Sequence, residues 1–268
     1  MRVETNERLV KWNTRLAHGL FFGTMGILAV AFFVANQQFF GQSTESTSSG
    51  LALLISSLML PVGMISTIFS VRLTNLWVRK PRPEIAIREG LKGLSAKSVL
   101  YNYYHFPARH VLITPQGVFA IVTRWQDGNY SVEGDAWKTH QGGFSRLLRI
   151  FRYDGLGNPN QDAVRAVARV RKHLEPIAPE IEVQPLIIFV DPRATLEAND
   201  PIIPAVYADS KQKPNLKDYL RAFSRETEET EANGSKSKKR NQQKSVKENP
   251  MPLTPEQIEA FEAASIGR

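Results

Sequence analysis

The chain of 268 residues contains no cysteine. This absence excludes disulfide bonds, thiolate nucleophiles and zinc sites built from cysteine. Acidic residues are in the minority, since 26 Asp and Glu stand against 34 Lys and Arg and leave a formal net charge of +8. Such a balance favours anionic partners, either nucleic acid or the acidic inner face of a membrane. The length suits one ordinary domain with additional segments.

Two long stretches lack charged side chains altogether. Residues 16–40 and residues 50–71 contain no Asp, Glu, Lys or Arg. The hydrocarbon core of a bilayer takes about 20 apolar residues of helix, so each stretch is long enough to span it. A signal peptide is the alternative for the first stretch, and a buried core helix is the alternative for both. Core helices seldom stay uncharged over such lengths, and we therefore expect two transmembrane helices.

The charges around these stretches predict their orientation. Basic residues precede the first stretch and follow the second: Arg2, Arg8, Lys11, Arg15, Arg72, Arg79, Lys80 and Arg82. The connecting loop, residues 41–49, carries only Glu45. Because positive charge concentrates on the cytoplasmic side, we expect a helical hairpin in the lipid bilayer with an external loop. Residues 1–15 and the chain after the hairpin would then be cytoplasmic.

From residue 80 to residue 223 the pattern predicts an α/β domain. We expect a helix at 84–94, a strand at 98–106, and a β-hairpin at 110–124 turning at Pro115-Gln116-Gly117. Two short strands around Gly134-Asp135 follow, then a helix opened by Asn158-Pro159, strands near 183–192 and 202–210, and a helix at 215–223. The helix after Asn158 has apolar residues at helical spacing, namely Ala163, Val164, Val167, Val170 and Leu174. This order suits a mixed sheet flanked by helices.

The C-terminal part divides into two segments. Residues 224–250 are acidic and then basic, with too few apolar residues to bury a core, and are predicted to be disordered. The basic half, at residues 236–240, could contact anionic lipid headgroups. Residues 251–268 predict a short helix with Thr254 as N-cap and Gln257 in the capping-box position. That helix would either dock on the domain or bind a partner.

The α/β region resembles the nuclease-related domain (NERD) family, from about Glu84 to Phe223. The resemblance is carried by the helix beginning at Glu84, the hairpin HVLITPQGVFAIVTRWQDG, the strand at Trp137, the helix start NPNQ and the strand PLIIFVD. It implies a restriction-endonuclease-like fold. Members of this family are also often joined to membrane spans, which agrees with the first quarter of the chain.

The resemblance also implies where a metal site would lie. Active relatives place an Asp at one strand end, a Glu and a Lys two residues apart on the next strand, and a further Glu on the first helix. Two carboxylates hold a divalent cation such as Mg²⁺, which activates the attacking water. Here the helix Glu is kept as Glu84, but the other positions fall on Arg109, Val122 and Arg124.

Those replacements argue against metal-dependent hydrolysis. Val122 cannot coordinate an ion, Arg109 would repel one, and Arg124 keeps the charge of lysine without its compact ammonium. We therefore expect no cofactor. Asp127, Glu133 and Asp135 could restore a Mg²⁺ site, although Asp-Gly and Gly-Asp pairs are typical of turns. His105 and His110 could transfer protons, but a histidine near a strand end is more often structural.

Basic residues could bind phosphate without cutting it. The candidates are Arg109 and Arg124 in the former cleft, with Arg146, Arg149 and Arg152 beside aromatic residues. The following helix adds Arg165, Arg169, Arg171 and Lys172. The alternative interpretation is a solvated face, or a segment that touches anionic lipid.

Three functions follow from these patterns. The first is a membrane-anchored, catalytically inactive NERD-like domain that serves as a cytoplasmic binding or scaffolding module. The second is a membrane-tethered nuclease with a rearranged site that uses Glu84 and Asp127. The third is a membrane protein whose cytoplasmic domain binds only other proteins.

Overall fold

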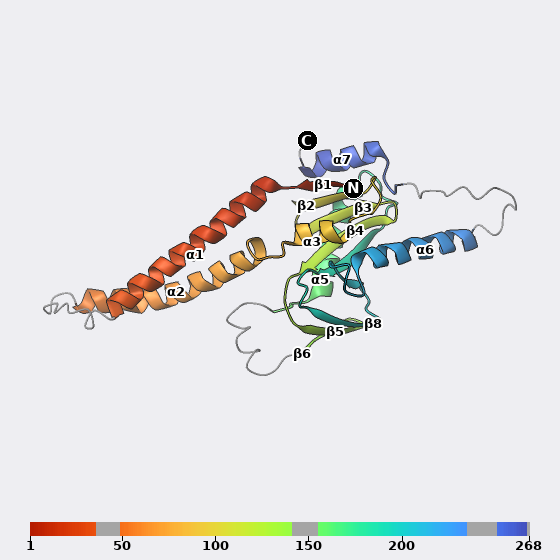
Figure 1. Cartoon of the computed structure of the whole chain (residues 1–268). Helices are drawn as coiled ribbons and strands as arrows, with labels where there is room; N and C mark the ends of the chain where they lie inside the picture. The colour runs from red at the N-terminus through yellow and green to blue at the C-terminus, as the bar shows by residue number, and fades with distance from the viewer. Residues whose placement is uncertain (36–48, 141–154, 235–250, 267–268) are drawn as a thin grey trace. The chain divides into compact units, whose positions relative to one another are not determined.

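The structure, a computed structural model, describes residues 1–35, 49–140, 155–234 and 251–266. These residues belong to two compact units. Of the described residues, the first unit contains 1–6, 81–140, 156–234 and 251–266, and the second contains 7–80 together with Gly155. The long apolar helices are therefore an insertion in the first unit, between its first strand and its first helix (Figure 1).

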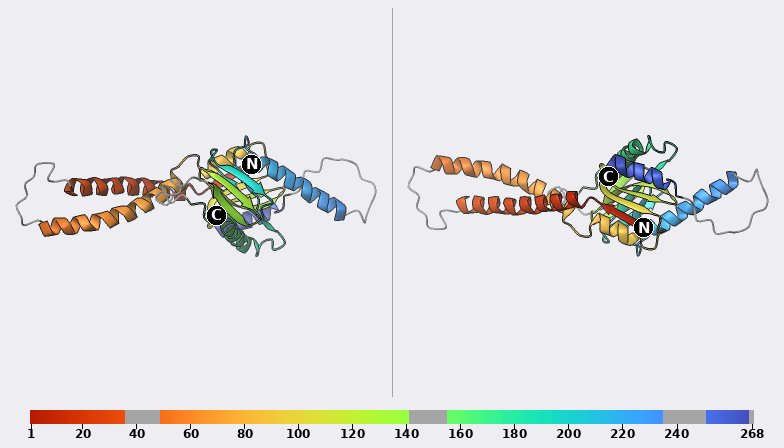
Figure 2. Two further views of the ribbon diagram at one scale, coloured as in Figure 1. Left: turned by 90° about the horizontal axis from the view of Figure 1, so that it is seen from below. Right: turned by 90° about the horizontal axis from the view of Figure 1, so that it is seen from above.

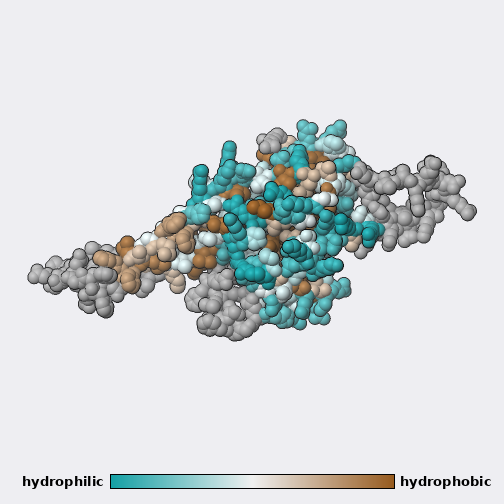
Figure 3. Space-filling view, in the orientation of Figure 1, coloured by the Kyte–Doolittle hydropathy of each residue, from teal (hydrophilic) through white to brown (hydrophobic). Residues whose placement is uncertain are grey.

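The second unit is a pair of helices, α1 (Glu7–Ala35) and α2 (Ser49–Trp77). Both are long and apolar enough to cross a membrane, since an 18-residue window has a mean hydropathy of 1.9 within Glu7–Phe33 and of 1.4 within Ser57–Trp77. Large apolar side chains cover their outer surface (Figure 3), among them Phe22, which is 69% exposed. Helix α1 begins before the predicted span of residues 16–40, and α2 extends beyond both ends of the predicted span of residues 50–71. Residues 36–40 of the first span and residues 41–48 of the loop lie outside the described residues.

The first unit is built on a six-stranded mixed sheet with the order β1-β2-β3-β4-β7-β9. Its strands are β1 (Arg2–Thr5), β2 (Val99–His105), β3 (Ala108–Thr114), β4 (Gly117–Arg124), β7 (Val183–Phe189) and β9 (Ala205–Tyr207). The predicted hairpin is confirmed, because β3 and β4 pair in an antiparallel register that closes at Thr114 and Gly117. Strands β4, β7 and β9 are parallel to one another.

A smaller sheet has the order β6-β5-β8. Its strands are β5 (Asn129–Glu133), β6 (Ala136–His140) and β8 (Thr195–Asn199). The predicted turn between β5 and β6 is confirmed, and Gly134 there has a φ of +57°, which glycine adopts without steric cost. Strand β8 was not predicted. Leu196 is its one buried residue, so its sequence carries no apolar pattern.

Helices cover both faces of the main sheet, as expected (Figure 2). On one face lie α3 (Pro83–Gly90) and α6 (Leu216–Gly234), and on the other lie α5 (Pro159–Leu174) and α7 (Pro255–Ile266). Alternate residues of β4 point into the two cores, since Phe119 and Ile121 pack toward α3 whereas Ala120 and Val122 pack toward α5. The predicted α/β class with a helix-flanked mixed sheet is thus confirmed.

Two of the predicted helix starts are confirmed in atomic detail. Asn158 Oδ1 accepts the Gln161 amide at 3.0 Å. Thr254 and Gln257 form the reciprocal capping box, at 2.9 and 3.2 Å. Phe261 of α7 is fully buried against the domain, so the C-terminal helix docks in the way the sequence allowed.

Other predictions need correction. Helix α3 ends at Gly90 and not at residue 94, because the hydrogen bonds that follow are those of tight turns, with the Lys92 amide donating to Glu89 O and the Leu94 amide to Leu91 O. Val164 is 60% exposed and does not join the core. Helix α6 continues to Gly234, so residues 224–234 are helical where disorder was predicted.

The N-terminal strand β1 was also not predicted. It pairs in parallel with β2, with Arg2 opposite Val99. The Arg2 amide donates to Ser98 O at 2.8 Å and the Asn6 amide to Asn102 O at 3.1 Å. Val3 packs against the core under α3 and α6. Residues expected only as a cytoplasmic tail therefore complete the sheet.

This pairing makes the first residues part of the domain's stability. We compare two soluble proteins, one in which a flexible Gly-Ser linker replaces residues 7–80, and one that begins at Pro81. The second loses the β1 hydrogen bonds and the Val3 packing, so we expect its free energy of unfolding to be lower by about 2 kcal/mol. Urea unfolding followed by circular dichroism measures the difference. Equal midpoints and slopes would contradict it.

Candidate functional site

The ends of β4 and β7 form the candidate site. These strands are parallel neighbours with Arg124 opposite Phe189, so their carboxyl ends meet at one edge of the sheet. Ligands of open α/β sheets bind at this kind of edge. We use the name β4–β7 edge for the charged residues gathered there: Arg124, Asp127, Asp162, Asp191 and Arg193.

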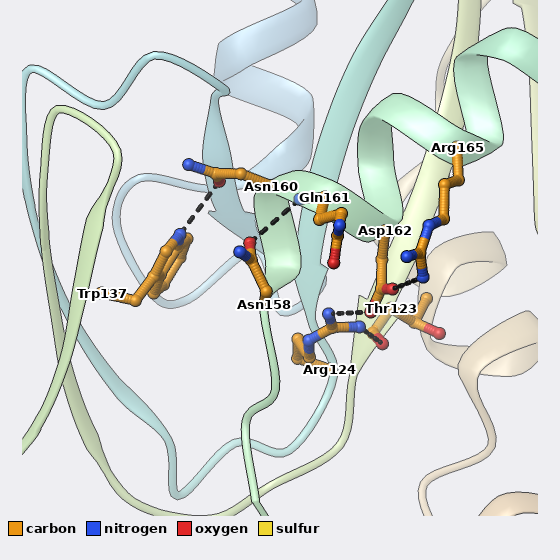
Figure 4. A network of polar contacts seen from close by, with 8 residues as sticks. All are labelled: Thr123, Arg124, Trp137, Asn158, Asn160, Gln161, Asp162 and Arg165. Atoms are coloured by element: carbon orange, nitrogen blue, oxygen red, sulfur yellow. Dashed lines mark hydrogen bonds and ion pairs between the residues drawn. The ribbon is translucent and has the colours of Figure 1, made fainter.

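Arg124 is a buried cation at the last position of β4. Its side chain is 9% exposed, and its Nη2 donates to Asp162 Oδ2 at 2.6 Å (Figure 4). Nη1 donates to Thr123 O at 3.3 Å, and Nε has no hydrogen-bond partner among the described residues. Burial lowers the pKa of Arg124, and the carboxylate of Asp162 opposes that shift. The guanidinium is thus held in place by the first turn of α5.

The start of α5 is tied to the small sheet by Asn160. Its Oδ1 accepts the Trp137 indole N–H at 2.9 Å (Figure 4). Its Nδ2 donates to Asp135 Oδ1. Asp135 thereby serves the β5–β6 turn and α5 together. The helix end that carries Asp162 is fixed by the hydrogen bonds of Asn160 as well as by its ion pair.

A second ion cluster closes the same edge. Arg193 Nη2 lies 2.8 Å from Asp191 Oδ2 and 3.1 Å from Asp127 Oδ2, and Arg193 Nε donates to Asp191 Oδ1 at 3.0 Å. The hydrogen bond to Asp191 is the first cause of a raised pKa for Arg193. Asp191 is 2% exposed, so its charge is compensated mainly by this guanidinium. The two carboxylates at the strand ends are therefore bridged by a cation of the chain itself.

Asp191 and Arg193 were not among the predicted site residues. Asp191 follows the buried strand β7 by two residues, after Val190, and precedes Pro192. A carboxylate so close to the end of a buried parallel strand was a usable signal. Arg193 had none, because only the fold brings it against Asp127.

The four positions carried over from the NERD resemblance do not share one face of the sheet. Val122 is 8% exposed, lies opposite Ile187 and belongs to the core under α5. Arg124, two residues further along the strand, lies on the same face and pairs with Asp162 of α5. Helix α3, which carries Glu84, packs on the opposite face.

Glu84 instead belongs to a separate polar cluster. It accepts a hydrogen bond from Tyr103 Oη at 2.8 Å, and Arg82 Nη1 lies 3.8 Å from its carboxylate. Tyr103 has a φ of +67°, a rare conformation for a bulky residue. Burial and then Glu84 raise the pKa of Tyr103, while the charge of Arg109 opposes the rise. The structure thus brings Glu84 and Arg109 together around Tyr103, apart from Val122 and Arg124.

The two candidate histidines are enclosed. His105 and His110 have no exposed surface, and burial lowers the pKa of each to about 3. His110 Nδ1 lies 2.8 Å from Asn102 Oδ1, and the His105 ring stacks on Phe261 at 4.7 Å between centroids. Both are neutral packing residues, closed off from any substrate.

Two of the remaining predicted positions can be placed. Glu133 lies at the exposed end of β5, with Lys138 at 3.9 Å. Asp135 follows it in the turn. Arg146, Arg149 and Arg152 lie outside the described residues. Within the described ranges, no group of three or more His, Asp or Glu side chains is arranged to hold a metal ion.

Comparison of the chain with models of known families, with curated proteins and with solved structures finds no match. The resemblance to the NERD family therefore stays a prediction that rests on the residues themselves.

The Arg124–Asp162 pair yields a stability prediction. Replacing Asp162 with Ala leaves a buried guanidinium without its carboxylate, and we expect the free energy of unfolding to fall by about 1–3 kcal/mol, since Asp162 is half-exposed. Adding Arg124→Met should recover part of the loss. The control is Arg165→Met, which removes the exposed partner of Asp162 at 3.9 Å and should change stability by less than about 0.5 kcal/mol. Equal losses in both single variants would contradict the buried pair's role.

The buried histidines predict a pH dependence. In the unfolded chain each binds a proton near pH 6.5, whereas in the folded chain it does so only near pH 3. The unfolded state therefore holds more protons in this window, and the free energy of unfolding falls as pH drops from 6.5 toward 3. The expected slope is about 1.4 kcal/mol per pH unit for each histidine.

Urea unfolding at several pH values measures this slope. His110→Gln, which keeps a hydrogen-bonding side chain beside Asn102, should remove about half of it. The same substitution at exposed His140 is the control. A slope that His110→Gln leaves unchanged would rule out the neutral buried imidazole as its source.

Proposed function

We propose that the protein is a membrane-tethered binding module, whose NERD-like, restriction-endonuclease-like cytoplasmic domain holds nucleic acid without hydrolysing it. The observation that carries this proposal is the state of the β4–β7 edge. Its strand-end positions are occupied by Arg124 paired with Asp162, and by two carboxylates bridged by Arg193.

The tether is supported by the way the chain is connected. Asn6 and Pro81 belong to one compact unit, and a compact domain lies on one side of a bilayer. The chain between them must therefore cross the bilayer an even number of times. Two long apolar helices in that interval agree with a two-span hairpin. The basic residues at its two ends favour the cytoplasmic side for the domain.

The loss of hydrolysis is supported by charge and burial. A divalent ion needs carboxylate oxygens that are free to coordinate it. Val122 packs in the core, and Asp162, Asp127 and Asp191 are each engaged by a guanidinium. A metal ion bound by Asp127 and Asp191 would have to displace Arg193. It would still be repelled by the positive charge of Arg124, three residues before Asp127.

The proposed binding surface lies on α5. Arg124 cannot serve, because it is buried and paired. Arg165, Arg169 and Lys172 are exposed, and their spacing puts them along one face of the helix. Three cations in a row suit successive phosphates of a nucleic-acid backbone. We call these three residues the α5 basic stripe.

Fluorescence anisotropy with labelled single- and double-stranded DNA tests the proposal, using the full chain in detergent micelles. Reversing the α5 basic stripe with R165E, R169E and K172E should weaken binding by tenfold or more and reduce its salt dependence. The control variant carries R88E, K211E and K213E, which change the same charge on exposed residues away from α5. Equal losses in the two variants would point to net charge alone and contradict a defined stripe.

The other functions are distinguished by the same preparation. Plasmid and single-stranded DNA are incubated with Mg²⁺ or Mn²⁺, and cleavage lost in Glu84→Ala or Asp127→Ala would support the nuclease. Binding to anionic lipid vesicles but not to DNA would assign the stripe to the membrane surface. Binding to neither would favour a module for protein partners.

A further inference from the structure

The C-terminal helix α7 is held on the domain by a small set of side chains. Phe261 is fully buried, stacks on His105 at 4.7 Å and meets the Tyr101 ring edge-on at 5.7 Å. Leu253, just before the helix, is also fully buried. In sequence, α7 is separated from α6 by residues 235–250, so its place on the sheet depends on these contacts.

Glu262, the next residue, connects α7 to both strands of the β1–β2 pair. Its carboxylate accepts the Tyr101 hydroxyl at 2.6 Å and pairs with Arg2 of β1. Arg2 Nη2 also donates to Tyr101 Oη at 3.2 Å. Because β1 is an edge strand that, among the described strands, pairs with β2 alone, this polar triad is a second attachment for it. The strand continues directly into α1.

His105, which lies beneath Phe261, cannot carry a charge in this arrangement. Neither ring nitrogen of His105 has a hydrogen-bond partner among the described residues, and the side chain is fully buried. Its neighbours are Tyr101 on β2, His173 and Arg169 on α5, and Phe261 on α7, with Glu262 engaged by Arg2 and Tyr101. Burial first, and then His173 and Arg169, lower the pKa of His105 to about 3. An imidazolium here would face cations and rings, with no acceptor for its protons.

We propose that α7 is a reversible strap that docks over neutral His105 and, through Glu262, holds β1 on the sheet, so that protonation of His105 releases α7 and loosens β1 together. Acidification would then act on the strand that leads into the apolar helices. This device does not depend on the nucleic-acid binding proposed above. Its contacts are made by His105, Phe261, Glu262, Tyr101 and Arg2, and of the α5 basic stripe only Arg169 acts on it, through its charge near His105.

The size of the effect follows from linkage. With α7 released, His105 regains access to water, and its pKa returns to the ordinary value of 6.5. Docking should then weaken about tenfold between pH 7.5 and pH 5.5.

Hydrogen exchange of the full chain in detergent micelles, read by mass spectrometry, measures this release. After correction for intrinsic exchange rates, the opening constant of residues 251–266 should rise about tenfold from pH 7.5 to pH 5.5. Residues 2–6 should open with them. Unchanged protection of α7 in the unmodified chain across this range would overturn the proposal without the need for any variant.

Three substitutions separate the parts of the mechanism. His105→Phe keeps a ring under Phe261 and should reduce the pH effect to less than about twofold. Glu262→Gln should raise the opening of residues 2–6 severalfold at pH 7.5, whereas the matched change Glu259→Gln, at an exposed position of α7, should not. An undiminished pH effect in His105→Phe would rule out this proton site. Equal behaviour of the two glutamate variants would rule out the link to β1.

Discussion

The burial of strand β4 on both faces is the constraint on which the rest of the domain depends. β4 lies between β3 and β7, with α3 and α6 over one face and α5 over the other. A carboxylate placed in the middle of such a strand would lose its hydration and find no partner. Val122 satisfies this environment by packing. The first residue that can carry charge is Arg124, where the strand ends, and even there it is neutralised by Asp162.

The same burial explains how charge is arranged at the sheet edge. Asp127, Asp162 and Asp191 are engaged by guanidinium groups that the chain itself supplies. Such an edge is satisfied without an added ion, because each buried charge has an opposite charge within hydrogen-bonding distance. The excess of basic residues is left on solvent-facing surfaces such as the outer side of α5. The charged residues of this edge contribute to the fold, and the exposed basic residues give the surface the capacity to attract anions.

The apolar helices are inserted between β1 and α3, so both of their outer ends continue into the fold of the domain. The domain is attached to this helical pair at two points, and one of them is a strand of its own sheet. A protein prepared from residue 80 onward would therefore lack part of the fold. Helix α7 adds to this arrangement, since Glu262 joins Arg2 across 260 residues of sequence and both contact Tyr101. The edge strand of the sheet is thus held by contacts between Arg2, Tyr101 and Glu262.

Local chemistry in the sequence was enough to determine the apolar helices, the two hairpins and the starts of α5 and α7. Turn residues such as Gly134 and caps such as Asn158 and Thr254 act on neighbours a few residues away, so their effect can be inferred without the fold. Strand β1, strand β8 and the Asp191–Arg193–Asp127 cluster depended on tertiary structure, because their partners are distant in sequence. Tertiary structure also placed Glu84 and Val122 on opposite faces of the sheet, because each face is defined by the helices that pack against it.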